Sequence, residues 1–126
     1  EVKHREAWRP FCPSFTSESF KFYFGHNKPA DYMIIAYYIK KKFISLFPSA
    51  VHIDGSVRPQ SVKKETNALF HSLIEEFGKL SGHPVLINTS FNIQGEPIVE
   101  TPRDALRCFG GTGIDVLVIG NYILEK

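Results

Sequence analysis

The sequence predicts a mixed α/β (α+β) domain: a twisted mixed sheet with packed helices. Aromatic and β-branched clusters, which are typical of strands, occupy the chain up to residue 60. A segment with apolar residues at three- and four-residue spacing follows, and this spacing indicates an amphipathic helix. A chain of 126 residues that is 43% hydrophobic can form one packed core, so we expect a single domain over residues 1–126.

The first half of the chain is predicted to supply strands. Its candidate segments are residues 20–24, 32–39 and 51–53. Gly25, Asn27, Pro29 and Pro48 separate these segments, and such residues are typical of turns. The prediction rests on the aromatic and β-branched composition of these segments.

The second half is predicted to contain two helices, a strand and a hairpin. Apolar residues from Leu69 to Leu80 indicate a helix with Thr66 or Asn67 as its N-cap and Gly82 beyond its end. A strand is expected at residues 84–88. Thr101-Pro102-Arg103-Asp104 has the cap, the first-turn proline and the acid that begin a helix. Residues 114–119 and 122–124 flank Gly120-Asn121, which predicts a hairpin.

Charge and composition make several classes of protein improbable. The net charge is +2, and the longest basic run is Lys40-Lys41-Lys42, so a nucleic-acid partner is not expected. Cys12 and Cys108 are far apart in sequence and are expected to be reduced, buried thiols of a cytoplasmic protein. Neither a membrane span nor a signal peptide is predicted. The single methionine is Met33, which indicates a piece of a longer protein or a processed terminus.

Three polar segments are candidate binding elements. In an extended segment Lys3, Arg5 and Arg9 share one face and can meet one anion. Arg58 follows the turn signal Asp54-Gly55. The loop at residues 88–96 carries amides and hydroxyls after an apolar run, where α/β sheets place ligand groups. The alternatives are solvated surface charges and a loop whose side chains bond to its own backbone.

The same segments resemble a known family. Arg-Glu-Ala-Trp-Arg-Pro-Phe-Cys-Pro-Ser at 5–14, His-Ile-Asp-Gly-Ser-Val-Arg-Pro-Gln at 52–60 and Asn-Thr-Ser-Phe-Asn-Ile-Gln-Gly-Glu-Pro-Ile-Val-Glu-Thr-Pro-Arg-Asp-Ala at 88–105 resemble the C-terminal part of the nodulation-type O-carbamoyltransferases. Ile-Asp-Val-Leu-Val-Ile-Gly-Asn-Tyr at 114–122 resembles the end of that family. A Gly-Arg-Ala-Leu-Gly-type segment that the family carries upstream is absent, and residues 20–48 match loosely.

The resemblance implies a function that the spacing alone does not. Those enzymes join an actin-like, metal-holding N-terminal transferase domain to a C-terminal domain similar to the YrdC-like threonylcarbamoyl-adenylate synthases. The second domain converts ATP and carbamoyl phosphate into carbamoyl adenylate, and the first passes the carbamoyl group to an acceptor hydroxyl. The present chain resembles the second domain, so its expected partners are ATP, carbamoyl phosphate and the actin-like domain.

Site residues follow from the resemblance by motif position. Lys3 and Arg9 match a basic pair at the phosphates, Arg58 matches a further phosphate-binding arginine, and Asn88 matches a polar contact to the carbamoyl group. Arg5, Ser90 and Asn92 are added as nucleotide-binding candidates, because Lys-x-Arg and Thr-Ser-x-Asn resemble elements of the synthases.

No metal-ligand set is predicted in this chain, and Mg²⁺ is expected to arrive with the nucleotide. Two alternatives stay open. One is a stand-alone carbamoyl- or threonylcarbamoyl-adenylate synthase domain, and the other is a non-catalytic RNA- or partner-binding module. Convergence of Lys3, Arg9, Arg58 and Asn88 on one concave pocket distinguishes the nucleotide-binding hypothesis from a flat basic face.

Overall fold

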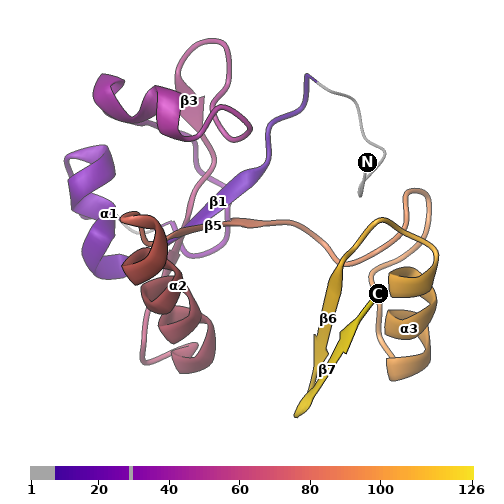
Figure 1. The fold of residues 1–126 in the computed structure, drawn as a ribbon. Helices are drawn as coiled ribbons and strands as arrows, with labels where there is room; N and C mark the ends of the chain where they lie inside the picture. The colour runs from indigo at the N-terminus through magenta and orange to yellow at the C-terminus, as the bar shows by residue number, and fades with distance from the viewer. Residues whose placement is uncertain (1–7, 29) are drawn as a thin grey trace. The chain divides into compact units, whose positions relative to one another are not determined.

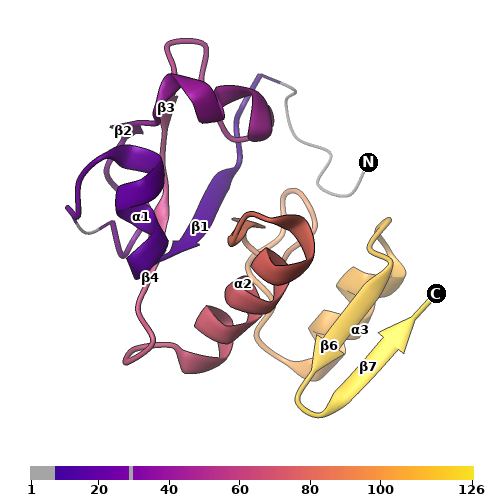
Figure 2. The ribbon, with the colours of Figure 1, turned by 60° about the vertical axis from the view of Figure 1, so that its left-hand side comes forward.

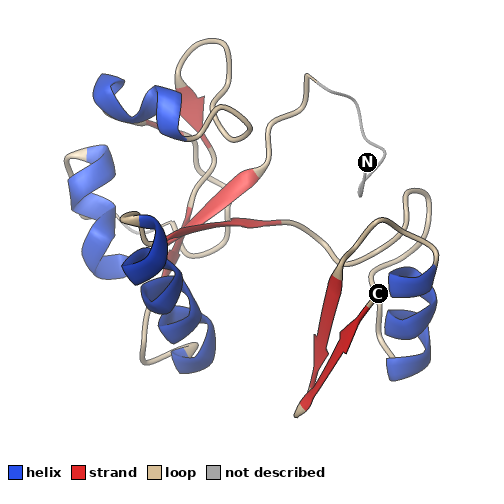
Figure 3. Ribbon diagram, viewed as in Figure 1, coloured by secondary structure: helices blue, strands red, loops and turns tan. Residues whose placement is uncertain are grey.

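The computed structural model describes residues 8–28 and 30–126 (Figure 1). The described residues form two compact units, Trp8–Thr89 and Ser90–Lys126. Each unit has its own hydrophobic cluster. Strands and helices occur in both, which confirms a mixed α/β chain (Figure 3). The single domain over residues 1–126 stays a prediction.

The first unit is built on a three-stranded sheet with the order β4-β1-β5. The central strand β1 (Cys12–Thr16) pairs in parallel with β4 (Gln60–Val62) and antiparallel with β5 (Val85–Asn88). Figure 2 shows β1 and β4 beside α1. The predicted strand at residues 84–88 is therefore confirmed as β5. Its register with β1 places Cys12 opposite Asn88 and Phe15 opposite Val85.

Residues 20–24 do not form a strand, and that prediction is wrong. They belong to helix α1 (Ser17–Phe24), which begins where the Thr16 side chain accepts a hydrogen bond from the backbone N–H of Ser19. Phe20, Tyr23 and Phe24 are buried because their spacing places them on one helix face. Gly25 ends the helix with φ 83°, a conformation that glycine adopts without steric cost.

The core of the first unit surrounds Phe15, which is fully buried. Its ring centroid lies 4.9 Å from that of Tyr23, 5.2 Å from that of Phe24 and 6.0 Å from that of Phe47. Edge-on and tilted ring pairs of this kind stabilise a core beyond their area burial. Tyr23 and Phe24 belong to α1, and Phe47 belongs to the segment after it. Both of these parts of the chain therefore pack against the central strand.

The segment between α1 and β4 contains less strand than its composition predicts. Of residues 32–39, Tyr37–Tyr38 form β2, which pairs with β3 (Ser56–Val57). Residues 41–46 form a 3₁₀ helix, and residues 51–53 are not a strand, so the prediction at 51–53 is wrong. The backbone N–H of His52 instead donates to the Ser56 carbonyl at 2.8 Å and closes a turn. Aromatic and β-branched composition does not create a strand where no partner strand is in register.

The predicted long helix is confirmed as α2 (Ala68–Ser81). The Asn67 side chain caps it by accepting from the backbone N–H of Phe70 at 3.1 Å, and Gly82 follows its end with φ 78°. A Cβ atom on Gly78 would lie 2.7 Å from the Cβ of Pro84. Glycine at this position therefore lets the helix approach the start of β5 closely.

The second unit consists of helix α3 (Pro102–Gly110) and the hairpin of β6 (Val116–Ile119) and β7 (Tyr122–Glu125). Thr101 and Asp104 form a reciprocal capping box at the start of α3. Ala105, Phe109 and Leu117 form the buried cluster between helix and hairpin. The predictions of a helix beginning at Thr101 and of a closing hairpin are confirmed. Among the helices of the described ranges, none is long and apolar enough to cross a membrane.

Candidate functional site

One face of the first unit's sheet carries polar side chains from all three strands. We define the polar face as Cys12 and Ser14 of β1, Gln60 of β4 and Asn88 of β5. Side chains alternate between the two faces of a strand, and directly paired residues share a face. The register pairs Ser14 with Gln60 and Cys12 with Asn88, so these four residues belong to the same face.

Hydrogen bonds link the three strands across the polar face. The Gln60 Oε1 atom accepts from Ser14 Oγ at 2.8 Å and from Asn88 Nδ2 at 2.9 Å. Ser14 is fully buried, so its hydroxyl depends on this acceptor. The Gln60 Nε2 atom donates to the backbone carbonyl of Asp31 at 3.3 Å. The Asn88 amide is therefore held in one orientation before any ligand binds.

Arg58 reaches the same region from the connection between β3 and β4. Its side chain is exposed, and Nη2 contacts the Sγ atom of Cys12 at 3.6 Å. Because Cys12 is the register partner of Asn88, Arg58 and Asn88 lie on either side of one β1 residue. The structure thus brings these two predicted site residues together, although they are 30 positions apart in the sequence. Their roles stay predictions.

The remaining predicted site residues are placed differently. Arg9 is exposed, with its guanidinium carbon 5.8 Å from the centroid of the Trp8 ring. Lys3 and Arg5 lie outside the described residues. Ser90 and Asn92 belong to the second unit, where Ser90 Oγ donates to Asn92 Oδ1 at 2.7 Å and Asn92 Nδ2 donates to the Glu96 carbonyl at 2.9 Å. These bonds match the alternative of a loop that satisfies its own polar groups.

The sequence patterns did not point to Asp31. Its carboxylate accepts from Ser61 Oγ at 2.7 Å and forms an ion pair with Lys63 Nζ at 2.6 Å. Hydrogen bonds from Lys63 and then from Ser61 lower the pKa of Asp31 below its ordinary value of 3.8. Because about thirty residues separate Asp31 from these partners, no short motif reveals the contact. Asp31 anchors the edge strand that carries Gln60.

The Asp31 ion pair predicts a pH-dependent contribution to stability. A carboxylate whose pKa is lower in the folded state stabilises the fold above its unfolded pKa, and the contribution is lost as pH falls through the folded value. We expect Asp31→Asn to lower Tm at pH 7, with the difference from wild type shrinking below about pH 3.8. Thermal melts from pH 2 to 8 measure it. Asp115→Asn, an exposed control, should show no such trend, and a pH-independent Asp31→Asn difference would contradict the ion-pair explanation.

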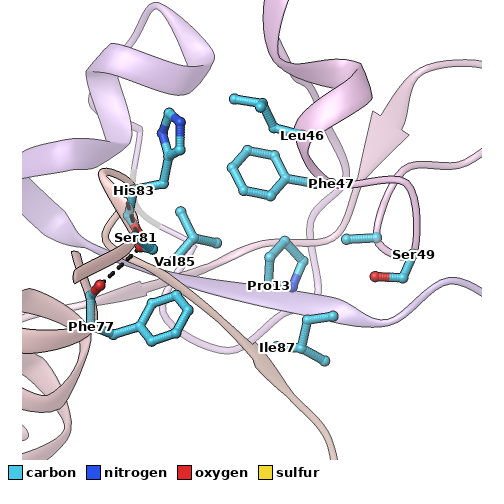
Figure 4. Close-up of a pocket in the computed structure, with 10 residues that line it drawn as sticks. Pro13, Leu46, Phe47, Ser49, Phe77, Ser81, His83, Val85 and Ile87 are labelled. Atoms are coloured by element: carbon cyan, nitrogen blue, oxygen red, sulfur yellow. Dashed lines mark hydrogen bonds between the residues drawn. The ribbon is translucent and has the colours of Figure 1, made fainter. Parts of the chain in front are cut away.

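The opposite face of β1 and β5 borders an apolar pocket of about 280 Å³ (Figure 4). This face carries the side chains that alternate with those of the polar face. In the register of β1 with β5 they are Pro13 paired with Ile87 and Phe15 paired with Val85. The lining residues are Pro13, Leu46, Phe47, Ser49, Ala50, Phe77, Ser81, His83, Val85 and Ile87. Tyr23 Oη lies 3.0 Å from His83 Nδ1, and burial raises the pKa of Tyr23. None of the lining residues is a lysine, arginine or carboxylate, so this pocket suits an apolar group rather than a phosphate.

Across residues 8–28 and 30–126, no three His, Cys, Asp or Glu side chains gather as a metal site. The Mg²⁺ expected with a nucleotide would be coordinated mainly by phosphate oxygens and water. Cys12 is partly buried and Cys108 is buried, and neither forms a disulfide.

Comparison with known proteins identifies the family. Residues 1–126 match the family model described as carbamoyltransferase C-terminus. The chain is 38% identical to Uncharacterized protein sll1178 of Synechocystis sp., over 100% of the chain and 24% of that protein. It is 35% identical to the nodulation protein NolNO of Sinorhizobium fredii, over 99% of the chain and 19% of that protein. It is 31% identical to the 3'-hydroxymethylcephem-O-carbamoyltransferase of Amycolatopsis lactamdurans, over 100% of the chain and 24% of that enzyme.

The chain thus spans about a fifth to a quarter of the length of these relatives. Both the family model and the identities cover essentially all of the chain, including the polar face and Arg58. This chain belongs to the carbamoyltransferase C-terminus family.

Proposed function

We propose that this chain binds ATP and carbamoyl phosphate and forms carbamoyl adenylate as the C-terminal part of an O-carbamoyltransferase. One observation carries the proposal: Arg58 and Asn88 lie beside the same β1 residue on the polar face. A guanidinium binds phosphate through charge-assisted, often bidentate hydrogen bonds, and a side-chain amide recognises a carbamoyl group. The arrangement provides one group for each part of carbamoyl phosphate.

Arg58 suits phosphate binding because its guanidinium is exposed and contacts the sulfur atom of Cys12. Sulfur is a weak acceptor, so a phosphate oxygen can replace it at little cost. By motif position, Lys3 and Arg9 are further candidate phosphate ligands, and Arg5, Ser90 and Asn92 are candidate nucleotide ligands. Clustered cations offset the repulsion between two anionic substrates.

Asn88 suits the carbamoyl group because Gln60 already fixes its amide. While Nδ2 donates to Gln60 Oε1, the Oδ1 atom can accept from a carbamoyl NH₂ group. Gln60 is in turn bonded to Ser14 and to the Asp31 backbone. A preorganised amide loses little entropy when the ligand binds.

The proposed reaction requires no covalent enzyme intermediate. Water releases phosphate from carbamoyl phosphate, and an oxygen of the resulting carbamate attacks the α-phosphorus of ATP. A carbamate O–P bond forms, the bond to the β-phosphate breaks, and pyrophosphate leaves. This chain's contribution is to position the two anions and to stabilise the charge on the phosphate oxygens. Magnesium bound to the nucleotide supplies further charge neutralisation.

The wider protein is part of the same proposal. Because the relatives are several times longer than this chain, we propose that it acts together with an actin-like N-terminal transferase domain, which holds the family's metal and transfers the carbamoyl group to a hydroxyl. We further propose a YrdC-like fold for residues 1–126 and a cytoplasmic location.

The test is Asn88→Asp. An Asp carboxylate cannot donate to Gln60, and it adds negative charge beside an anionic substrate. We expect the Kd for carbamoyl phosphate to rise about 5- to 150-fold, since a lost or reversed polar contact costs about 1–3 kcal/mol. Isothermal calorimetry with carbamoyl phosphate at a saturating non-hydrolysable ATP analogue measures the change.

Asn121→Asp is the matched control, because Asn121 is exposed in the turn of the β6–β7 hairpin and acquires the same charge. It should leave the Kd unchanged. An Asn88→Asp protein that remains folded and keeps the wild-type carbamoyl phosphate affinity would remove Asn88 from the site. Absence of binding by the wild-type chain to ATP and to carbamoyl phosphate alike would favour the non-catalytic alternative.

A further inference from the structure

A groove of about 420 Å³ lies at the start of β1, within the first unit. Its lining residues are Trp8, Pro10, Val51, His52, Ile53 and Asp54. Trp8 is the only tryptophan of the chain, and 75% of it is exposed. A tryptophan is among the most apolar and largest side chains, so its exposure in a groove provides an aromatic surface for a ligand ring.

We propose that this groove binds the purine base of the nucleotide, with the base stacked on Trp8. The proposal rests on the proposed ATP binding and extends it by naming the residues that hold the base. Every nucleobase has a π-face, and an aromatic side chain binds it without needing a matched hydrogen-bond pattern.

The groove lies within reach of the proposed phosphate contacts. Trp8 is four residues before Cys12, and Asp54 is four residues before Arg58, while Cys12 and Arg58 contact each other. Four extended residues span at most about 14 Å, so the Cα atom of Trp8 lies within that distance of the Cα atom of Cys12, and the Cα atom of Asp54 within that distance of the Cα atom of Arg58. The ribose and phosphate groups of a nucleoside triphosphate can bridge such a gap. One nucleotide can therefore occupy the groove and meet Arg58.

The lining residues 52–54 belong to a turn that is held by its own hydrogen bonds. The His52 N–H donates to the Ser56 carbonyl at 2.8 Å, and the Gly55 N–H donates to the His52 carbonyl at 2.9 Å. Asp54 Oδ1 accepts from the Ser56 backbone N–H at 2.9 Å. A carboxylate at this position can also accept a hydrogen bond from the exocyclic amino group of adenine. The turn thus offers apolar contact through Ile53 and a polar contact through Asp54.

Trp8 itself reports on the proposed stacking, because all tryptophan emission of the chain comes from this residue. We would titrate the 126-residue chain with ATP, with adenosine monophosphate and with inorganic pyrophosphate, and record emission and calorimetric Kd values. Both adenine nucleotides should quench Trp8, whereas pyrophosphate should bind without quenching. Trp8→Ala should raise the Kd for ATP about ten- to a hundredfold and leave that for pyrophosphate unchanged, while Trp8→Phe should keep most of the ATP affinity.

Two controls separate this inference from the proposed function. Tyr32→Ala removes another exposed aromatic side chain, 80% exposed, and should change neither affinity. Arg58→Ala should weaken ATP and pyrophosphate together. Wild-type ATP affinity in Trp8→Ala, or equal quenching by pyrophosphate, would overturn the base site while ATP binding stands. Failure of the wild-type chain to bind either ATP or pyrophosphate would overturn both the base site and the proposed function.

Discussion

Replacing Arg58 with alanine is expected to weaken the binding of ATP or carbamoyl phosphate by about 2–4 kcal/mol, which corresponds to a rise in Kd of about 30- to 1000-fold. The physical reason is the loss of charge-assisted hydrogen bonds to phosphate oxygens. Stability should change little, because the Arg58 side chain is exposed and contacts Cys12 Sγ at 3.6 Å. Isothermal calorimetry gives the affinities, and thermal melts give Tm.

Two further variants show which property of Arg58 matters. Arg58→Lys keeps the positive charge but not the planar fork, so its loss of affinity should fall between wild type and Arg58→Ala. Arg103→Ala removes an exposed arginine from α3 in the second unit and should leave both Kd values unchanged. Equal affinities for wild type and Arg58→Ala would end the phosphate-binding role of Arg58. An Arg58→Ala chain that unfolds would show the residue to be structural.

Replacing Phe15 with alanine is expected to lower the free energy of unfolding by about 3–5 kcal/mol, the usual cost of deleting a buried phenyl ring. Phe15 is fully buried on the central strand, where its ring packs against Tyr23, Phe24 and Phe47. A loss of this size is a large fraction of the stability of an ordinary domain. Urea or thermal unfolding followed by circular dichroism measures it.

Phe22→Ala provides the matched comparison, because Phe22 lies on α1 but is 54% exposed. Its cost should be much smaller than that of Phe15→Ala. Phe15→Leu should retain the fold and much of the ligand affinity, since the proposed ligand contacts belong to the opposite face of β1. A Phe15→Ala chain as stable as wild type would show that the cluster around Phe15 does not dominate the first unit's core.

The sequence correctly predicted the helices whose capping residues and apolar periodicity indicate the same boundaries. Asn67 and Gly82 bound α2, and Thr101 with Asp104 begins α3, because capping hydrogen bonds involve residues close in sequence. The aromatic cluster at 20–24 misled the prediction, since a run of aromatic residues suits a buried helix face as well as a strand. The Thr16 cap and the burial of Phe20 against Phe15 favour the helix.

Sequence patterns were sufficient to predict the family-like motifs, the two capped helices, the hairpin and the residue types able to bind phosphate and carbamoyl groups. Which of these residues lie close together depends on strand pairing, which appears only in the folded chain. Arg58 and Asn88 become neighbours because β1 pairs with β5 in a register that places Cys12 opposite Asn88. Burial of Phe15 and Val85 on the other face selects that register, since a one-residue slip would turn these side chains outward. Sequence patterns did not predict Gln60 or Asp31 as part of the candidate site. Their contacts depend on pairing between segments far apart in the sequence, and no local pattern encodes such pairing.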